Sequence, residues 1–160
     1  PEAEKYSESE SPLKLDKLLE MNQTLLISRI DEEIRRARRY HHTFTLTTIR
    51  IQGLKELLSE NREEGLKLIN QIGSGIKNMI RSTDYYSWIE IDTFTVLSIE
   101  SLGRIKTLEE RINNFINGFL EKKDIYDPES FRAFSSYARF PGKSKTPSEL
   151  IIESRKLLPV

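Results

Sequence analysis

Apolar side chains recur at steps of three and four residues through much of the chain, and this spacing predicts α-helices. The longest series begins at Leu15 and ends at Ala37. Gly53 marks a break before a short helix, and Thr146 followed by Pro147 is typical of a helix start. The helices expected from these signals cover residues 15–37, 54–58, 63–81 and 105–119, followed by a last one after Thr146.

Four other segments alternate large apolar or β-branched residues with polar ones, which predicts β-strands. They are residues 43–51, 85–91, 93–99 and 131–140. Only Asp92 separates the second strand from the third, so these two strands should form a hairpin. The expected fold is therefore α/β (α+β), with a central, mostly antiparallel sheet, helices on both of its faces, and a long helix in front.

Composition excludes several classes of function. The chain has 160 residues, and its 25 basic and 25 acidic side chains cancel, so we expect neither a broad polyanion-binding surface nor a DNA partner. It has no cysteine, which excludes disulfides, thiolate catalysis and cysteine-bound zinc. The only histidines, His41 and His42, are adjacent and should point apart, so we expect no metal site. No apolar run approaches the roughly 20 residues of a membrane-spanning helix, so we expect no membrane contact from this segment.

The predicted hairpin reads Glu90-Ile91-Asp92-Thr93-Phe94 around its turn. In this sequence and in the order of its elements, the chain resembles the GGDEF domain of diguanylate cyclases, which make cyclic di-GMP from two GTP molecules. The resemblance covers residues 28–156 and implies a nucleotidyl-cyclase-like fold preceded by a helix. It divides the chain into a disordered leader or linker at residues 1–12, where glutamates lie among serines, a linker helix at residues 13–27 and the domain at residues 28–160.

Four positions depart from the family pattern where the family performs catalysis. Glu90 and Ile91 replace two glycines, Thr93 replaces the catalytic glutamate, and Arg50 stands where the first strand supplies a metal-binding acid. Of the family's acids only Asp92 is kept, whereas two-metal phosphoryl transfer needs several carboxylates to hold magnesium. The resemblance therefore implies a degenerate domain that is not an enzyme, with no catalytic residue, metal or cofactor. We expect Arg50 and Asp92 to form an ion pair in place of the metal.

A second feature of the family is kept. Active members are often inhibited by their product at an Arg-x-x-Asp (RxxD) motif five residues before the signature, and Arg81-Ser82-Thr83-Asp84 has this pattern and offset. Arg111 matches a second arginine that the family places on the helix after the hairpin. Arg81 can donate to guanine O6 and N7, Asp84 can accept from guanine N1 and N2, and Arg111 can stack on the base or pair with phosphate. The resemblance therefore implies a cyclic di-GMP receptor.

Two other functions remain open at this point. The chain is a nucleotide-free pseudoenzyme that acts as a protein-interaction or dimerisation module if Arg81 and Asp84 only close a helix end and Arg111 is a surface charge. It retains GTP binding or cyclase activity if the lost groups are compensated. For all three functions the resemblance implies attached domains or a partner protein, a bacterial cytoplasmic location, and a homodimer as one assembly to expect.

Overall fold

The computed structural model describes residues 12–99, 104–123 and 131–159. The leader expected at residues 1–12 lies outside this range except for Pro12, at which the first helix begins. The elements are α1 (Pro12–Tyr40), β1 (Phe44–Gln52), α2 (Leu54–Glu60), α3 (Arg62–Met79), β2 (Tyr85–Glu90), β3 (Thr93–Ile99), α4 (Arg104–Lys123), β4 (Arg132–Phe140) and α5 (Pro147–Ser154). Their order and types confirm the sequence prediction. No helix in the described ranges is long and apolar enough to cross a membrane.

The four strands form one sheet in the order β2-β3-β1-β4, and all of its pairings are antiparallel. The expected hairpin joins β2 to β3, with a register shift between Trp88 and Glu90. This shift places Glu90 opposite Thr93, while Arg50 of β1 lies opposite Thr93 from the other side. Arg50, Thr93 and Glu90 therefore form one row across three strands.

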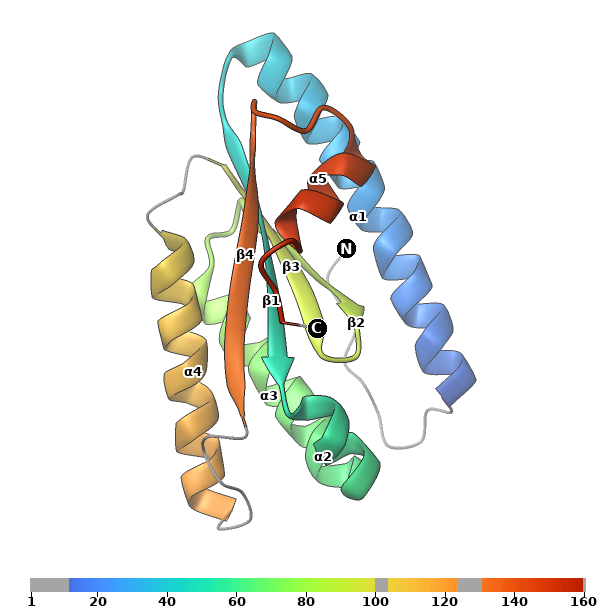
Figure 1. The fold of residues 1–160 in the computed structure, drawn as a ribbon, viewed down its shortest axis with the longest axis vertical. Coiled ribbons are helices and arrows are strands. Elements are labelled where there is room, and N and C mark those ends of the chain that lie inside the picture. The colour runs from blue at the N-terminus through green and yellow to red at the C-terminus, as the bar shows by residue number, and fades with distance from the viewer. Residues whose placement is uncertain (1–11, 100–103, 124–130, 160) are drawn as a thin grey trace.

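Helices cover both faces of the sheet, as Figure 1 shows, with α1 and α5 on one face and α3 and α4 on the other. One buried cluster joins α2, α3, α4 and the start of α1, at Leu15 and Leu18, to the sheet, and the other joins the rest of α1 and α5 to the opposite face. Helix α1 continues without a break through residue 28, and Leu15, Leu18 and Leu26 along it are all buried. Its first half therefore packs on the same domain as its second half.

Side-chain amides bind backbone groups of both outer strands. From α1, Asn22 Nδ2 donates to the Trp88 carbonyl at 2.9 Å and Gln23 Nε2 donates to the Ile89 carbonyl at 2.8 Å. From α4, Asn113 accepts from the Ala133 N–H at 2.7 Å and donates to its carbonyl at 3.2 Å. These contacts fix α1 against β2 and α4 against β4.

Two local signals in the sequence act as expected. Gly53 has φ 96°, a left-handed conformation that costs glycine little, and it separates β1 from α2. Thr146 accepts a hydrogen bond from the Glu149 N–H at 3.2 Å, while the Glu149 carboxylate accepts from the Thr146 N–H at 3.1 Å. This reciprocal pair is a capping box, with Pro147 at the first turn of α5.

Replacing Thr146 by alanine should lower the free energy of unfolding by about 1 kcal/mol at pH 7. Hydrogen bonds from the Lys145 N–H and then the Thr146 side chain hold the pKa of Glu149 below its ordinary value. The contribution of the ionised Glu149 carboxylate is therefore present above its unfolded-state pKa and is lost as the pH falls through its lowered folded-state pKa. Urea unfolding should show a smaller cost of Thr146→Ala at pH 3 than at pH 7. Thr146→Ser keeps the acceptor and is the control; an equal loss in both variants would contradict the capping role.

Candidate functional site

The turn between α3 and β2 brings Arg81 and Asp84 together. The Asp84 carboxylate accepts the Arg81 backbone N–H at 2.8 Å, and the Arg81 carbonyl accepts the Asp84 N–H at 3.0 Å. The Arg81 guanidinium lies 3.6 Å from the same carboxylate and also donates to the Ile99 carbonyl at 2.6 Å. The RxxD motif is thus a closed turn that orients its arginine.

Exposure separates the roles of the two side chains. The side chain of Asp84 is 1% exposed, whereas that of Arg81 is 45% exposed. The Asp84 carboxylate is therefore turned toward Arg81 and not toward solvent. The sequence analysis expected it to accept hydrogen bonds from guanine, for which it would have to face the ligand. The Arg81 guanidinium is the group of this pair that a ligand reaches. The helix-end ion pair that a purely structural role would require is also present.

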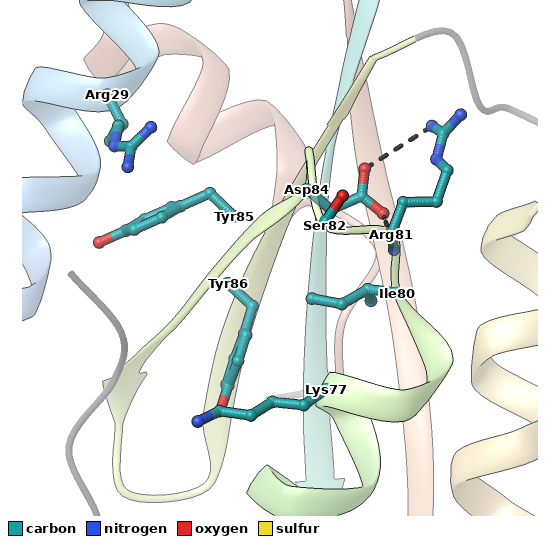
Figure 2. Close-up of a pocket in the computed structure, with 8 residues that line it drawn as sticks. All are labelled: Arg29, Lys77, Ile80, Arg81, Ser82, Asp84, Tyr85 and Tyr86. Atoms are coloured by element: carbon teal, nitrogen blue, oxygen red, sulfur yellow. Dashed lines mark hydrogen bonds and ion pairs between the residues drawn. The ribbon is translucent and has the colours of Figure 1, made fainter.

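A pocket of about 400 Å³ adjoins the turn, and Figure 2 shows the side chains around it. Helix α1 contributes Arg29 and helix α3 contributes Lys77, while Tyr85 and Tyr86 come from the start of β2. The complete lining is Arg29, Lys77, Ile80, Arg81, Ser82, Asp84, Tyr85 and Tyr86. The pocket thus combines three cations, two phenol rings and one carboxylate.

The sequence analysis predicted only the RxxD part of this pocket and missed most of its lining. Tyr85 and Tyr86 directly follow the RxxD motif, and that adjacency was a usable signal. Nothing in the sequence points to Arg29, because it is one of several exposed cations on α1. Lys77 follows the helical pattern of α3 and has no signal of its own.

Arg111 is placed apart from this pocket. It is exposed on α4 and does not line the pocket. In Figure 2 the Arg81 guanidinium extends away from Arg29, toward the side on which α4 lies. Arg81 therefore stands between the pocket on one side and the helix that carries Arg111 on the other.

The prediction of an ion pair between Arg50 and Asp92 is wrong. The Arg50 guanidinium lies 3.7 Å from the Glu90 carboxylate, its ion-pair partner, and its Nε donates to Thr93 Oγ1 at 3.2 Å. The Thr93 hydroxyl in turn donates to Asp92 at 2.9 Å, so it stands between the guanidinium and that carboxylate. The reason is the row across the strands: Glu90 and Thr93 share it with Arg50, whereas Asp92 lies in the turn beyond it.

The segment after α5 crosses the face of the sheet on which α1 and α5 lie, as Figure 1 shows in red. The Pro159 carbonyl accepts from Arg50 Nη1 at 2.5 Å, and Arg155 forms an ion pair with Glu90. The Leu157 N–H donates to the Ser136 hydroxyl at 3.1 Å. Arg50 and Glu90, two of the positions that depart from the family pattern, are therefore already bound by other residues of this chain. Ile91, at the tip, packs against the core.

Metal-ligating side chains do not converge on this face or elsewhere in residues 12–99, 104–123 and 131–159. No three His, Cys, Asp or Glu side chains in those ranges lie close enough together to hold a metal ion.

Comparison with known proteins agrees with the fold. A family model described as "Diguanylate cyclase, GGDEF domain" matches residues 16–158. Among curated proteins, none matches the chain. The GGDEF domain of PA1120 (TpbB or YfiN) from Pseudomonas aeruginosa is 16% identical over 82% of this chain and 77% of its own, with a TM-score of 0.66.

Two further solved structures share the fold at low identity. The active GGEEF domain of a diguanylate cyclase from Vibrio cholerae is 13% identical, covers 84% of this chain and 86% of its own, and has a TM-score of 0.68. The GGDEF domain of DgcB from Caulobacter crescentus, solved in complex with c-di-GMP, is 10% identical, covers 84% and 78%, and has a TM-score of 0.64.

Proposed function

The chain belongs to the diguanylate cyclase GGDEF-domain family, and on that premise we propose that it binds cyclic di-GMP as a receptor domain and does not make the dinucleotide. One observation carries the proposal: the RxxD turn is closed, and it holds an exposed Arg81 guanidinium at the edge of a pocket rich in cations and tyrosines. A planar guanidinium in a fixed orientation suits the O6 and N7 acceptors of guanine.

The three site residues have different parts in this proposal. Arg81 donates to the guanine edge, and Asp84 holds the turn that orients it. Arg111, on the helix toward which Arg81 extends, supplies a second guanidinium that stacks on the base or pairs with a phosphate. We place the domain in the bacterial cytoplasm, where an attached domain or a partner protein responds to its occupancy.

Contacts around the hairpin residues Glu90 to Thr93 and around Arg50 support the absence of cyclase activity. Thr93, at the position of the catalytic glutamate, is fully buried, and its hydroxyl bridges Arg50 and Asp92. Magnesium does not fit these residues, because the Arg50 guanidinium takes the place of a ligand and the Asp92 carboxylate is already engaged. Arg155 and Pro159 fill the same face.

A structural role is the second candidate, because the Arg81–Asp84 pair already satisfies itself without ligand. Calorimetric titration of the chain with cyclic di-GMP separates the two functions, with GTP and cyclic di-AMP as control ligands. The receptor function requires saturable binding of cyclic di-GMP that exceeds the binding of both controls. No heat of binding with cyclic di-GMP would leave the protein-interaction module as the function.

Incubation with GTP and magnesium should yield no cyclic di-GMP, because one retained acid cannot hold the metal ions that the reaction needs. Product analysis by chromatography at high protein concentration is the measurement. Asp92→Ala is the matched control, since a product that persists in this variant comes from a contaminating enzyme. A product made by the wild type and lost in Asp92→Ala would refute the proposal.

A further inference from the structure

Arg29 of α1 faces the pocket from the side opposite the RxxD turn, as Figure 2 shows. We propose that Arg29, with Lys77 and Tyr85, forms the second half of the cyclic dinucleotide site, so that the bound ligand bridges α1 and the RxxD turn. This inference rests on the proposed function. It extends the site to a helix that neither the motif nor the hairpin includes.

The charge of the pocket fits a ligand with two phosphates. Three cations line it, and the single carboxylate, Asp84, is already paired with Arg81. Basic side chains therefore outnumber acidic ones in the lining, although they balance over the whole chain. Its volume of about 400 Å³ lies within the range of roughly 300–1,000 Å³ that is usual for small-molecule sites.

Arg29 is held in a way that leaves its hydrogen-bond donors available. Its guanidinium carbon lies 4.8 Å from the centroid of the Tyr85 ring, which is a cation–π contact. Within the described part of the chain, no acidic side chain pairs with it. Arg35, six residues further along α1, is instead paired with Asp31 at 3.2 Å. Arg29 is therefore oriented by an aromatic ring and open to an anion.

The pocket wraps around the start of the outer strand β2. Tyr85 lies on the face that packs with α1, and Tyr86 lies on the other face, where its hydroxyl donates to the Gly73 carbonyl of α3 at 3.2 Å. A ligand in the pocket thus touches α1, α3 and β2 together. The phenol ring of Tyr85 offers a stacking surface for a purine, and Arg29 is placed to pair with a phosphate.

This arrangement gives the ligand a direct effect on α1. The helix is already fixed to β2 by Asn22 and Gln23, and Ile30, next to Arg29, is fully buried. A ligand that pairs with Arg29 adds a link between α1 and the turn after α3. Occupancy is therefore expected to reduce local opening of α1 around Arg29.

Titration calorimetry with cyclic di-GMP on the full chain tests the inference. Arg29→Ala should weaken binding by about 5- to 20-fold, the range of a partly desolvated cation contact. Arg35→Ala is the matched control on the same helix and should stay within about twofold of the wild type, since exposed ion pairs contribute little. Far-ultraviolet circular dichroism establishes that both variants are folded.

Hydrogen exchange provides a second readout. Amides of residues 26–33 should exchange more slowly when cyclic di-GMP is added to the wild type, and this protection should be absent in Arg29→Ala at saturating ligand. If Arg81→Ala weakens binding while Arg29→Ala binds as the wild type does, the inference is wrong and the proposed function stands. If the wild type itself does not bind cyclic di-GMP, both are wrong.

Discussion

Replacing Arg81 by alanine is expected to weaken cyclic di-GMP binding by roughly 5- to 150-fold, equivalent to about 1–3 kcal/mol. The physical reason is the loss of a planar fork that donates two parallel hydrogen bonds to a guanine edge. The fork is already oriented, because Arg81 is tied to Asp84 and to the Ile99 carbonyl. Titration calorimetry on wild type and variant measures the effect directly.

Three variants sharpen this prediction. Arg81→Lys keeps the charge and loses the fork, so its affinity should fall close to that of Arg81→Ala. Asp84→Asn should weaken binding as well, because the guanidinium loses the carboxylate that holds it. Arg132→Ala removes an exposed cation that lies on β4 against Phe134 and should leave binding unchanged. Wild-type affinity in both Arg81→Ala and Asp84→Asn would place the ligand elsewhere.

Replacing Phe94 by alanine should lower the free energy of unfolding by about 3–5 kcal/mol, the usual cost of deleting a buried phenylalanine side chain. Phe94 is 0% exposed, and its ring centroid lies 5.0 Å from that of Trp88. It also lies opposite Ile49 in the sheet, so its loss leaves a cavity shared by three strands. Since a domain is stable by only about 5–15 kcal/mol, a large share of the stability is lost.

Urea unfolding followed by circular dichroism measures this loss. Phe94→Leu leaves a smaller cavity and should cost less than Phe94→Ala. Tyr137→Ala changes an exposed ring on β4 and should shift the free energy of unfolding by at most about 0.5 kcal/mol. An unfolding midpoint of Phe94→Ala close to that of the wild type would contradict a core role. Phe94 lies in the hairpin directly after Thr93, and its burial gives it a structural role in the core.

The fold was predictable because its signals are local. Alternation along residues 93–99 and helical spacing along residues 63–81 each need only neighbouring residues to be read. Gly53 and Thr146 marked element boundaries through backbone conformation and capping, which are also local effects. The resemblance to the family then predicted how these elements are arranged in space.

The site was less predictable because its contacts join distant parts of the chain. Arg29 reaches Tyr85 and the pocket only because α1 packs along β2, and no spacing in the sequence encodes that contact. The partner of Arg50 depended on the irregular register near Trp88, which brings Glu90 into the row. The sequence does not reveal that shift, so the sequence analysis took Asp92, the acid kept from the family pattern, as the partner of Arg50. That pair is the wrong one.

The amides on the two outer strands have a consequence for the exposed edges of the sheet. An unpaired strand edge invites another chain to add a strand, which is a common route to aggregation. Here Asn22 and Gln23 occupy carbonyls of β2, and Asn113 occupies both backbone groups of Ala133 on β4. An incoming strand would have to displace these side chains before it could pair at those positions. At those positions the two sheet edges are therefore protected against edge-to-edge pairing with another chain.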